Sequence, residues 1–336
     1  MKTMTRTPLW FAVLAAALAA VFFLNIGFGS TSMSFGEVAR AVLSLGGEGE
    51  SGYLIVQMIR LPRALASIAG GAAIAIAGFL LQTFFNNPIV EPYVLGVSSG
   101  SMLFVGMVVM GGYTFGLKRI SPLFSFIGAF AGAMLVMAVV LFAARRVKSI
   151  VTLLIIGLMA GYLCGALTSI LSAFADKEQI ARFSLWSMGS FSGFTWQQVR
   201  ILYAITLPTL FCAFLLAKPL NALAMGALYA ESMGVNTKLM RIGLILISSI
   251  LTAATTAFAG PISFIGLSVP HICRILLGTS NSRILLPAVV LGGACMAGLC
   301  DFIARTIMAP VEIPLGAVTA LVGAPIVVRL LTRREA

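Results

Sequence analysis

Residues 64–84 read ALASIAGGAAIAIAGFLLQTF, a stretch of 21 residues without a charged side chain. The hydrocarbon core of a bilayer is about 30 Å thick, and roughly twenty residues of α-helix cross it. Because lipid offers no hydrogen-bond partner to an exposed backbone, a crossing segment of this length is helical. The stretch therefore predicts a transmembrane helix.

Nine further apolar runs of similar length fill most of the chain. Hydrophobic residues make up 60% of the 336 residues, charged residues 10%, and the mean hydropathy is +1.07. A soluble domain carries about a quarter charged residues. We therefore predict an all-α polytopic membrane protein, with one transmembrane domain over residues 1–336 because no polar stretch is long enough for a soluble domain. The ten expected spans are residues 8–28, 64–84, 94–112, 122–144, 150–173, 198–217, 241–259, 261–277, 284–305 and 314–331.

The basic residues favour one orientation of these spans. Lys2 and Arg6 precede the first run, which is long for a signal peptide and lacks an Ala-x-Ala cleavage site, so an uncleaved first helix is favoured. With the N-terminus inside, 13 Lys and Arg residues fall on the cytoplasmic side and 9 outside. The positive-inside rule thus favours both termini in the cytoplasm. The net charge of +12 is spread singly or in pairs over the gaps, which argues against nucleic-acid binding.

Two outer gaps, residues about 29–59 and about 175–197, have the character of interfacial segments. Ser34 and Glu37 form a capping-box pattern before an amphipathic stretch. The second gap contains Trp186 and Trp196, aromatic residues of the kind that anchor a segment at the headgroup level.

Small residues also recur every four positions, which predicts close helix packing and a candidate dimer face. These stripes are Gly96/Gly100, Gly128/Gly132 and Gly157/Gly161/Gly165.

Three of the arginines predicted on the outer side lie directly at the ends of spans, against the orientation rule. Arg60 and Arg63 precede the second span, and Arg305 ends the ninth. One interpretation is contact with lipid headgroups by snorkelling. Another is docking of an acidic partner, since arginine binds carboxylates bidentately. Asp301 lies one turn before Arg305, so an i,i+4 pair that neutralises both is a further alternative.

The cytoplasmic gap at residues 218–241 predicts a short helix over 226–233, with Gly234 as its left-handed terminator. Such a helix could bind a cytosolic partner. The alternative is that the segment is a plain connector loop without a partner.

Several kinds of chemistry find no support in the sequence. His271 is the only histidine and no acid cluster accompanies it, so no metal site is expected. Pro270 is expected to bend or end the helix there. The sequence contains no Gly-x-x-x-x-Gly-Lys-Ser/Thr loop for ATP. The five cysteines form no Cys-x-x-Cys pair and are interpreted as small core residues.

Taken together, these motifs resemble the permease subunits of bacterial ABC importers for iron–siderophore complexes, haem and cobalamin. The matching pieces, from about residue 60 onward, are Arg60-Leu-Pro-Arg63, Gln82, Asn87-Pro-Ile-Val-Glu-Pro92, Leu95-Gly-Val-Ser-Ser-Gly100, Trp186-Ser-Met-Gly189, Gly226 to Gly234, Gly260 to Arg274, Asp301 with Arg305, Glu312-Ile-Pro-Leu-Gly316 and Gly323-Ala-Pro325.

The resemblance implies the type II importer fold in the bacterial cytoplasmic (inner) membrane. It also implies a second permease copy in a homodimer, two cytosolic ATPases that hold ATP and magnesium, and a periplasmic or lipid-anchored binding protein. The chain itself is then not an enzyme and binds no cofactor or metal.

In that family the positions of Arg60, Arg63 and Arg305 form salt bridges with glutamates of the binding protein. The resemblance likewise implies that Gly226, Ala230, Glu231 and Gly234 belong to the helix that couples to the ATPase. It places a possible gate at Ile150 and Val151, where this chain is apolar and family members can have hydroxyl residues.

The expected function is therefore import of an iron chelate, a siderophore complex or haem, with cobalamin as the alternative. A secondary carrier or channel and a membrane-embedded enzyme are distant alternatives. Ionisable groups are nearly absent from the middle of the spans, which disfavours ion-coupled carriers.

Overall fold

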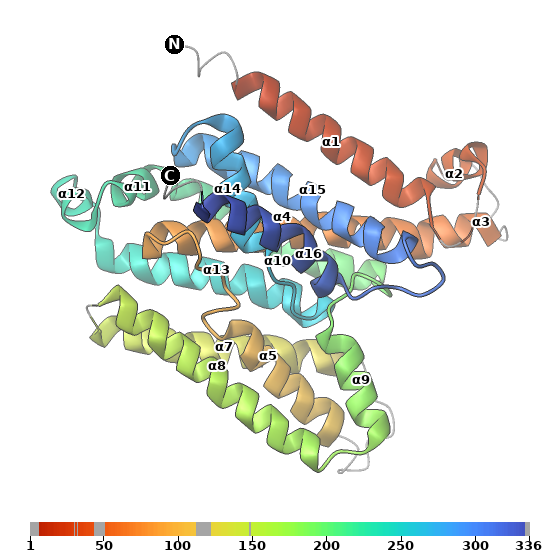
Figure 1. The fold of residues 1–336 in the computed structure, drawn as a ribbon, viewed down its shortest axis with the longest axis horizontal. Coiled ribbons are helices and arrows are strands. Elements are labelled where there is room, and N and C mark those ends of the chain that lie inside the picture. The colour runs from red at the N-terminus through yellow and green to blue at the C-terminus, as the bar shows by residue number, and fades with distance from the viewer. Residues whose placement is uncertain are drawn as a thin grey trace.

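The computed structural model describes residues 7–29, 31, 33–43, 51–111, 122–147 and 149–332. Regular structure in these ranges is entirely helical (Figure 1). Among the described residues, seven helices are long and apolar enough to span a membrane, and three shorter apolar helices accompany them. The predicted all-α fold with ten apolar helices is confirmed.

The long spans include one composite helix, made of α3 (Ser51–Leu54), the π-helical η1 (Ile55–Arg60) and α4 (Leu61–Phe85). The others are α1 (Thr7–Gly27), α7 (Pro122–Arg146), α8 (Ile150–Ala173), α10 (Trp196–Leu215), α13 (Thr237–Ala259) and α15 (Ser282–Thr306). The shorter ones are α5 (Val97–Gly106), which continues as η2 (Met107–Gly111), α14 (Ile265–Leu277) and α16 (Leu315–Thr332). Four small helices lie outside the spans: α2 (Phe35–Val42), α9 (Lys177–Ser187), α11 (Ala217–Ala224) and α12 (Ala227–Ser232).

Helix α4 lies at the centre and is almost wholly buried by α15, α13, α14 and α10. Glycines allow this: a Cβ atom on Gly71 would overlap the backbone of Gly293, and one on Gly78 would overlap the backbone of Gly266. Without a hydrophobic effect between helices in lipid, such close backbone contact is a main source of packing energy.

The predicted glycine stripes serve packing within the chain. A Cβ on Gly100 would overlap the carbonyl of Gly132, which sets α5 against α7. Gly96 faces Gly157 and Gly161, which sets α5 against α8. Gly165 has no neighbour within 4 Å of such an atom. A role of these stripes in a dimer face stays a prediction.

The eighth span differs from the prediction. It begins at Ile265 rather than 261, because Gly260 (φ +74°) and Phe264 (φ +67°) hold the preceding residues out of helical geometry. Pro270 also does not end α14. A proline leaves the carbonyl four residues earlier without its helical partner, and here the Gln82 side chain donates to that carbonyl, Gly266 O, at 3.0 Å.

The interfacial segments contain the predicted helices. Ser34 and Glu37 form the capping box of α2, with the Ser34 amide 2.8 Å from the Glu37 carboxylate. Asp176 and Gln179 form another at α9. Residues 44–50 of the first segment lie outside the described residues, and residues 51–59 are helical and continue into α4. Helices α2 and α3 lie on the right of Figure 1, and α11 and α12 lie on the left.

The contact between α4 and α14 can be tested with Gly78→Ala. The added methyl group overlaps the Gly266 backbone, and overpacking of this kind costs about 1–3 kcal/mol. We expect a lower midpoint of thermal unfolding for the detergent-purified protein. Gly165→Ala, where the methyl group meets open space, is the matched control, and equal midpoints for the two variants would contradict this packing account.

Candidate functional sites at the two ends of the spans

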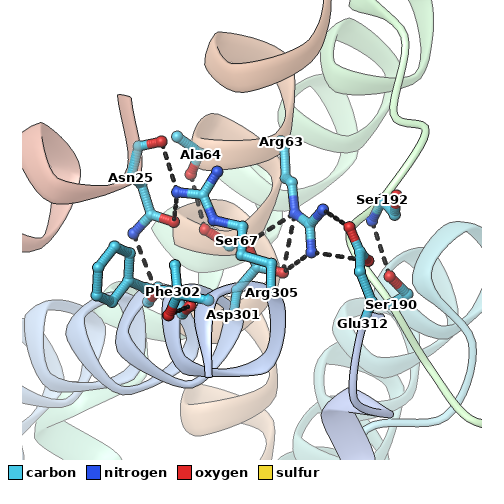
Figure 2. A network of polar contacts seen from close by, with 12 residues as sticks. Asn25, Arg63, Ala64, Ser67, Ser190, Ser192, Asp301, Phe302, Arg305 and Glu312 are labelled. Atoms are coloured by element: carbon cyan, nitrogen blue, oxygen red, sulfur yellow. Dashed lines mark hydrogen bonds and ion pairs between the residues drawn. The ribbon is translucent and has the colours of Figure 1, made fainter. Parts of the chain in front are cut away.

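Arg63 is the centre of a charged network where α4 begins and α15 ends (Figure 2). Its Nε lies 2.9 Å from Asp301 Oδ2, and its Nη1 lies 2.6 Å from Glu312 Oε1. The Arg63 and Asp301 side chains are 6% and 1% exposed, but that of Glu312 is 42% exposed. Two carboxylates therefore bind one buried guanidinium: that of Asp301 is itself buried, and that of Glu312 is partly exposed to solvent.

The predicted i,i+4 pair of Asp301 and Arg305 is wrong. Asp301 turns to Arg63, because the glycine contacts bring α4 within reach of α15. Arg305 Nη2 instead donates to the backbone oxygen of Asn25 at 2.6 Å and to its side-chain Oδ1 at 3.0 Å. The Nε of Arg305 is buried, and no hydrogen-bond partner for it lies in the part of the chain that the structure describes.

The Arg60 side chain caps the C-terminal end of α1. It donates to the carbonyls of Ile26 and Gly27 at 2.8 and 2.9 Å, and to that of Thr31 at 2.6 Å. The last carbonyls of a helix lack internal partners, and a cation there also complements the helix dipole. The Arg60 side chain thus fixes the junction between α1 and the segment that follows it.

The three predicted docking arginines converge at one end of the bundle, but all are buried, at 3% (Arg60), 5% (Arg63) and 7% (Arg305) exposure. Burial in protein contradicts the snorkelling interpretation, in which the guanidinium groups reach lipid headgroups. Their docking role stays a prediction. Sequence reasoning missed the partners Asn25 and Glu312, although a polar residue inside the first apolar run was a signal for the former.

The short helix predicted over 226–233 is present as α12, while its coupling to an ATPase stays a prediction. Gly226 precedes it with φ +117°, and Gly234 follows it with φ +80°. The Gly234 amide donates to Glu231 O and the Val235 amide to Ala230 O, both at 2.9 Å. These two bonds form the Schellman motif, in which a left-handed glycine satisfies the last helical carbonyls.

Apolar side chains face outward around α12. Ala230 is fully buried, and the Glu231 carboxylate accepts a hydrogen bond from Thr237 at 2.6 Å. Leu228 is 85% exposed and Met233 is 64% exposed. The predicted residues therefore shape the helix, while its exposed face consists of side chains that the sequence reading did not single out.

The possible gate lies at the start of α8. Ser149 caps this helix, and Val151 on its first turn is 65% exposed. The side chain of Ile150 lies outside the described residues. Gating by Ile150 and Val151 stays a prediction.

A cavity of about 670 Å³ lies along α8, on the side that faces α5. Its walls carry tyrosines, hydroxyl groups and glycine backbone, with no charged side chain. They include Tyr93, Ser99, Met102, Tyr162, Gly165, Thr168 and Ser169.

His271 lines a smaller cavity of about 230 Å³ with Gln82, Asn86, Asn87 and Arg274. The Arg274 guanidinium donates to the side-chain Oε1 of Gln82 at 2.9 Å. Within the described part of the chain, no group of three His, Cys, Asp or Glu side chains is placed to hold a metal ion.

Comparison with known proteins gives consistent matches over nearly the whole chain. The sequence model of the FecCD transport family matches residues 17–333. The haemin transport system permease protein HmuU of Yersinia pestis is 38% identical over 279 residues, which cover 82% of this chain and 83% of that protein. The vitamin B12 import system permease protein BtuC of Klebsiella pneumoniae is 38% identical over 288 residues, with 84% and 83% covered.

Solved structures with a similar fold agree with these sequence matches. An inward-facing ABC transporter assigned to the metal-chelate type superposes with a TM-score of 0.85 at 29% identity, covering 97% of this chain and 99% of that one. PsaBC from Streptococcus pneumoniae, in complex with Fab, shares the fold with a TM-score of 0.53 at 16% identity, covering 86% and 93%.

Asp301→Asn tests the buried network. Removing one partner of a buried ion pair costs about 3–5 kcal/mol, so we expect a clear loss of unfolding free energy, measured with denaturing detergent in mixed micelles. Glu178→Gln removes a carboxylate from the exposed pair with Arg182 at 2.8 Å, and such surface pairs contribute little. Equal losses in both variants would show that Asp301 does not hold the network.

Proposed function

Because this chain belongs to the FecCD transport family, we propose that it is the membrane-spanning permease of an ATP-driven importer in the bacterial inner membrane. Its proposed cargo is an iron chelate, either haem or a siderophore complex, with cobalamin as the alternative. The similarity to a haemin permease supports haem, and the equal identity to a vitamin B12 permease supports cobalamin as the alternative.

The observation that carries the proposal is α12. A six-residue helix framed by two left-handed glycines, with Leu228 and Met233 exposed, is a surface for a protein partner rather than for lipid or water. A secondary carrier has no need of such a surface. An ATPase subunit there supplies the ATP site that the sequence lacks.

The other proposed partners occupy the remaining surfaces. An external binding protein docks at the arginine cluster, at the end of the spans opposite α12. A second copy of this chain faces α8, whose exposed side chains include Val151, Ile155 and Met159. Two copies with two ATPases then form a pathway that alternates by rigid-body movement of the helices.

The cavity between α5 and α8 suits a cargo that brings its own metal ligands. Its walls offer aromatic and hydroxyl contacts through Tyr93, Tyr162 and Ser99, but no charge. A metal that is already chelated needs no ligand from the protein. The wall has only to orient the chelate and let it pass.

Uptake by reconstituted vesicles tests the function. With the ATPase and the binding protein present, we expect accumulation of one of three labelled cargoes (haem, a ferric siderophore or cobalamin) only when ATP is supplied. Vesicles without ATP are the control. Uptake that proceeds without ATP and without the ATPase would contradict the proposal and favour a secondary carrier.

Leu228→Asp tests the coupling surface. A carboxylate in an apolar interface must be desolvated, so we expect at least about a tenfold loss of ATP-driven uptake and reduced co-purification of the ATPase. Leu185→Asp on α9 is the control, because Leu185 is also exposed, at 69%, but lies in an outer segment. Full uptake by Leu228→Asp would refute the assignment of α12.

A further inference from the structure

The two carboxylates that hold Arg63 are not equivalent. Asp301 is 1% exposed and bonds to both Nε and Nη2 of the guanidinium, at 2.9 and 3.0 Å. Glu312 is 42% exposed and bonds to Nη1 and Nη2 at 2.6 and 3.2 Å. Figure 2 shows the two acids approaching Arg63 from different elements. Asp301 is therefore a permanent partner, while Glu312 can exchange its bonds for water.

Glu312 belongs to the segment that leads into α16. Ile313 N donates to Ala304 O at 2.8 Å, and Leu315 N donates to Gly189 O at 3.2 Å. Gly316 N lies 3.3 Å from Met188 O. The ion pair of Glu312 with Arg63 adds a side-chain contact to these few backbone bonds. Loss of that pair loosens the start of α16.

The cluster also carries an excess of positive charge. Arg60, Arg63 and Arg305 face only two carboxylates, Asp301 and Glu312, within the described network. A third carboxylate brought to this place therefore meets a favourable potential. The geometry that suits it best is the one Glu312 already uses, two parallel N–H···O bonds to one guanidinium.

We propose that Glu312 is an exchangeable internal ligand of Arg63, which an acidic side chain of the docking binding protein displaces, and that this displacement frees the start of α16. The inference rests on the proposed docking of an acidic partner at this cluster. The exchange is one carboxylate for another, so the buried Arg63 never loses its charge balance. Glu312 moves only from partial to full exposure. Docking is thereby linked to α16, one of the shorter apolar helices of the bundle.

Glu312→Gln in the complex with the ATPase tests the exchange. The amide is a weaker competitor for Arg63, so the binding protein encoded in the same gene cluster should bind about two- to fivefold more tightly, as expected for a partly exposed ion pair. Glu178→Gln is the matched control, because it removes an exposed carboxylate from the pair with Arg182. Equal or weaker binding by Glu312→Gln than by this control would overturn the proposal.

A second measurement needs no partner. Hydrogen exchange of the peptide that contains residues 313–316 should be several-fold faster in Glu312→Gln than in the unchanged protein, while the α9 peptide stays the same. Unchanged exchange at 313–316 would show that Glu312 does not hold the start of α16, and would also overturn the proposal.

The double variant Arg63→Gln/Asp301→Asn separates this inference from the proposed function. It removes the docking cation together with its buried counter-charge, so the net charge of the cluster is unchanged and no charge is left behind by the loss of one partner of this pair alone. If this variant binds the binding protein as well as the unchanged complex does, docking at Arg63 itself is refuted. If it binds weakly while Glu312→Gln binds no more tightly than the unchanged complex, docking stands and only the exchange is refuted.

Discussion

The contact of α4 with α15 and α14 determines the rest of the structure. Helix backbones approach this closely only where both sides lack side chains, as Gly71 and Gly293 do. That approach brings Arg63 on α4 to Asp301 on α15 and Gln82 on α4 to the backbone of Gly266. A larger side chain along this line would push α4 away from α15 and α14, and would lengthen these contacts beyond the donor–acceptor distance of about 2.7–3.2 Å that a hydrogen bond needs.

The same contact makes the irregular α14 possible at the depth of the membrane. Polar backbone groups in lipid must find partners inside the protein. Gln82 satisfies the two carbonyls of Gly266 and Leu267, and the Glu91 carboxylate accepts the amide of Phe264 at 3.1 Å. A helix that begins late and contains a proline is thus stabilised by two side chains from elsewhere in the chain.

Much of this architecture could be predicted from local sequence. The ten apolar helices, the capping box at Ser34 and the terminator Gly234 depend on residues close together in the chain, so their patterns are visible in it. The partners of Arg63 and Arg305 could not be predicted, because the nearest acid to Arg305 in sequence, Asp301, bonds across the bundle instead. Likewise, the sequence could not show that the helix continues past Pro270, because Gln82, whose side chain donates to Gly266 O, lies 184 residues earlier.

Asn25 has a consequence for the order in which the protein is made. Its side-chain amide donates to Val21 O inside α1 at 2.9 Å, and to Gly298 O, 273 residues later, at 3.0 Å. While the chain is being synthesised, α1 enters the membrane long before Gly298 and Arg305 exist. The bond to Val21 gives the amide a partner during that interval, which lowers the cost of a lone polar group in lipid. Helix α1 thus reaches α15, the helix it contacts most, only after more than 250 further residues have been made.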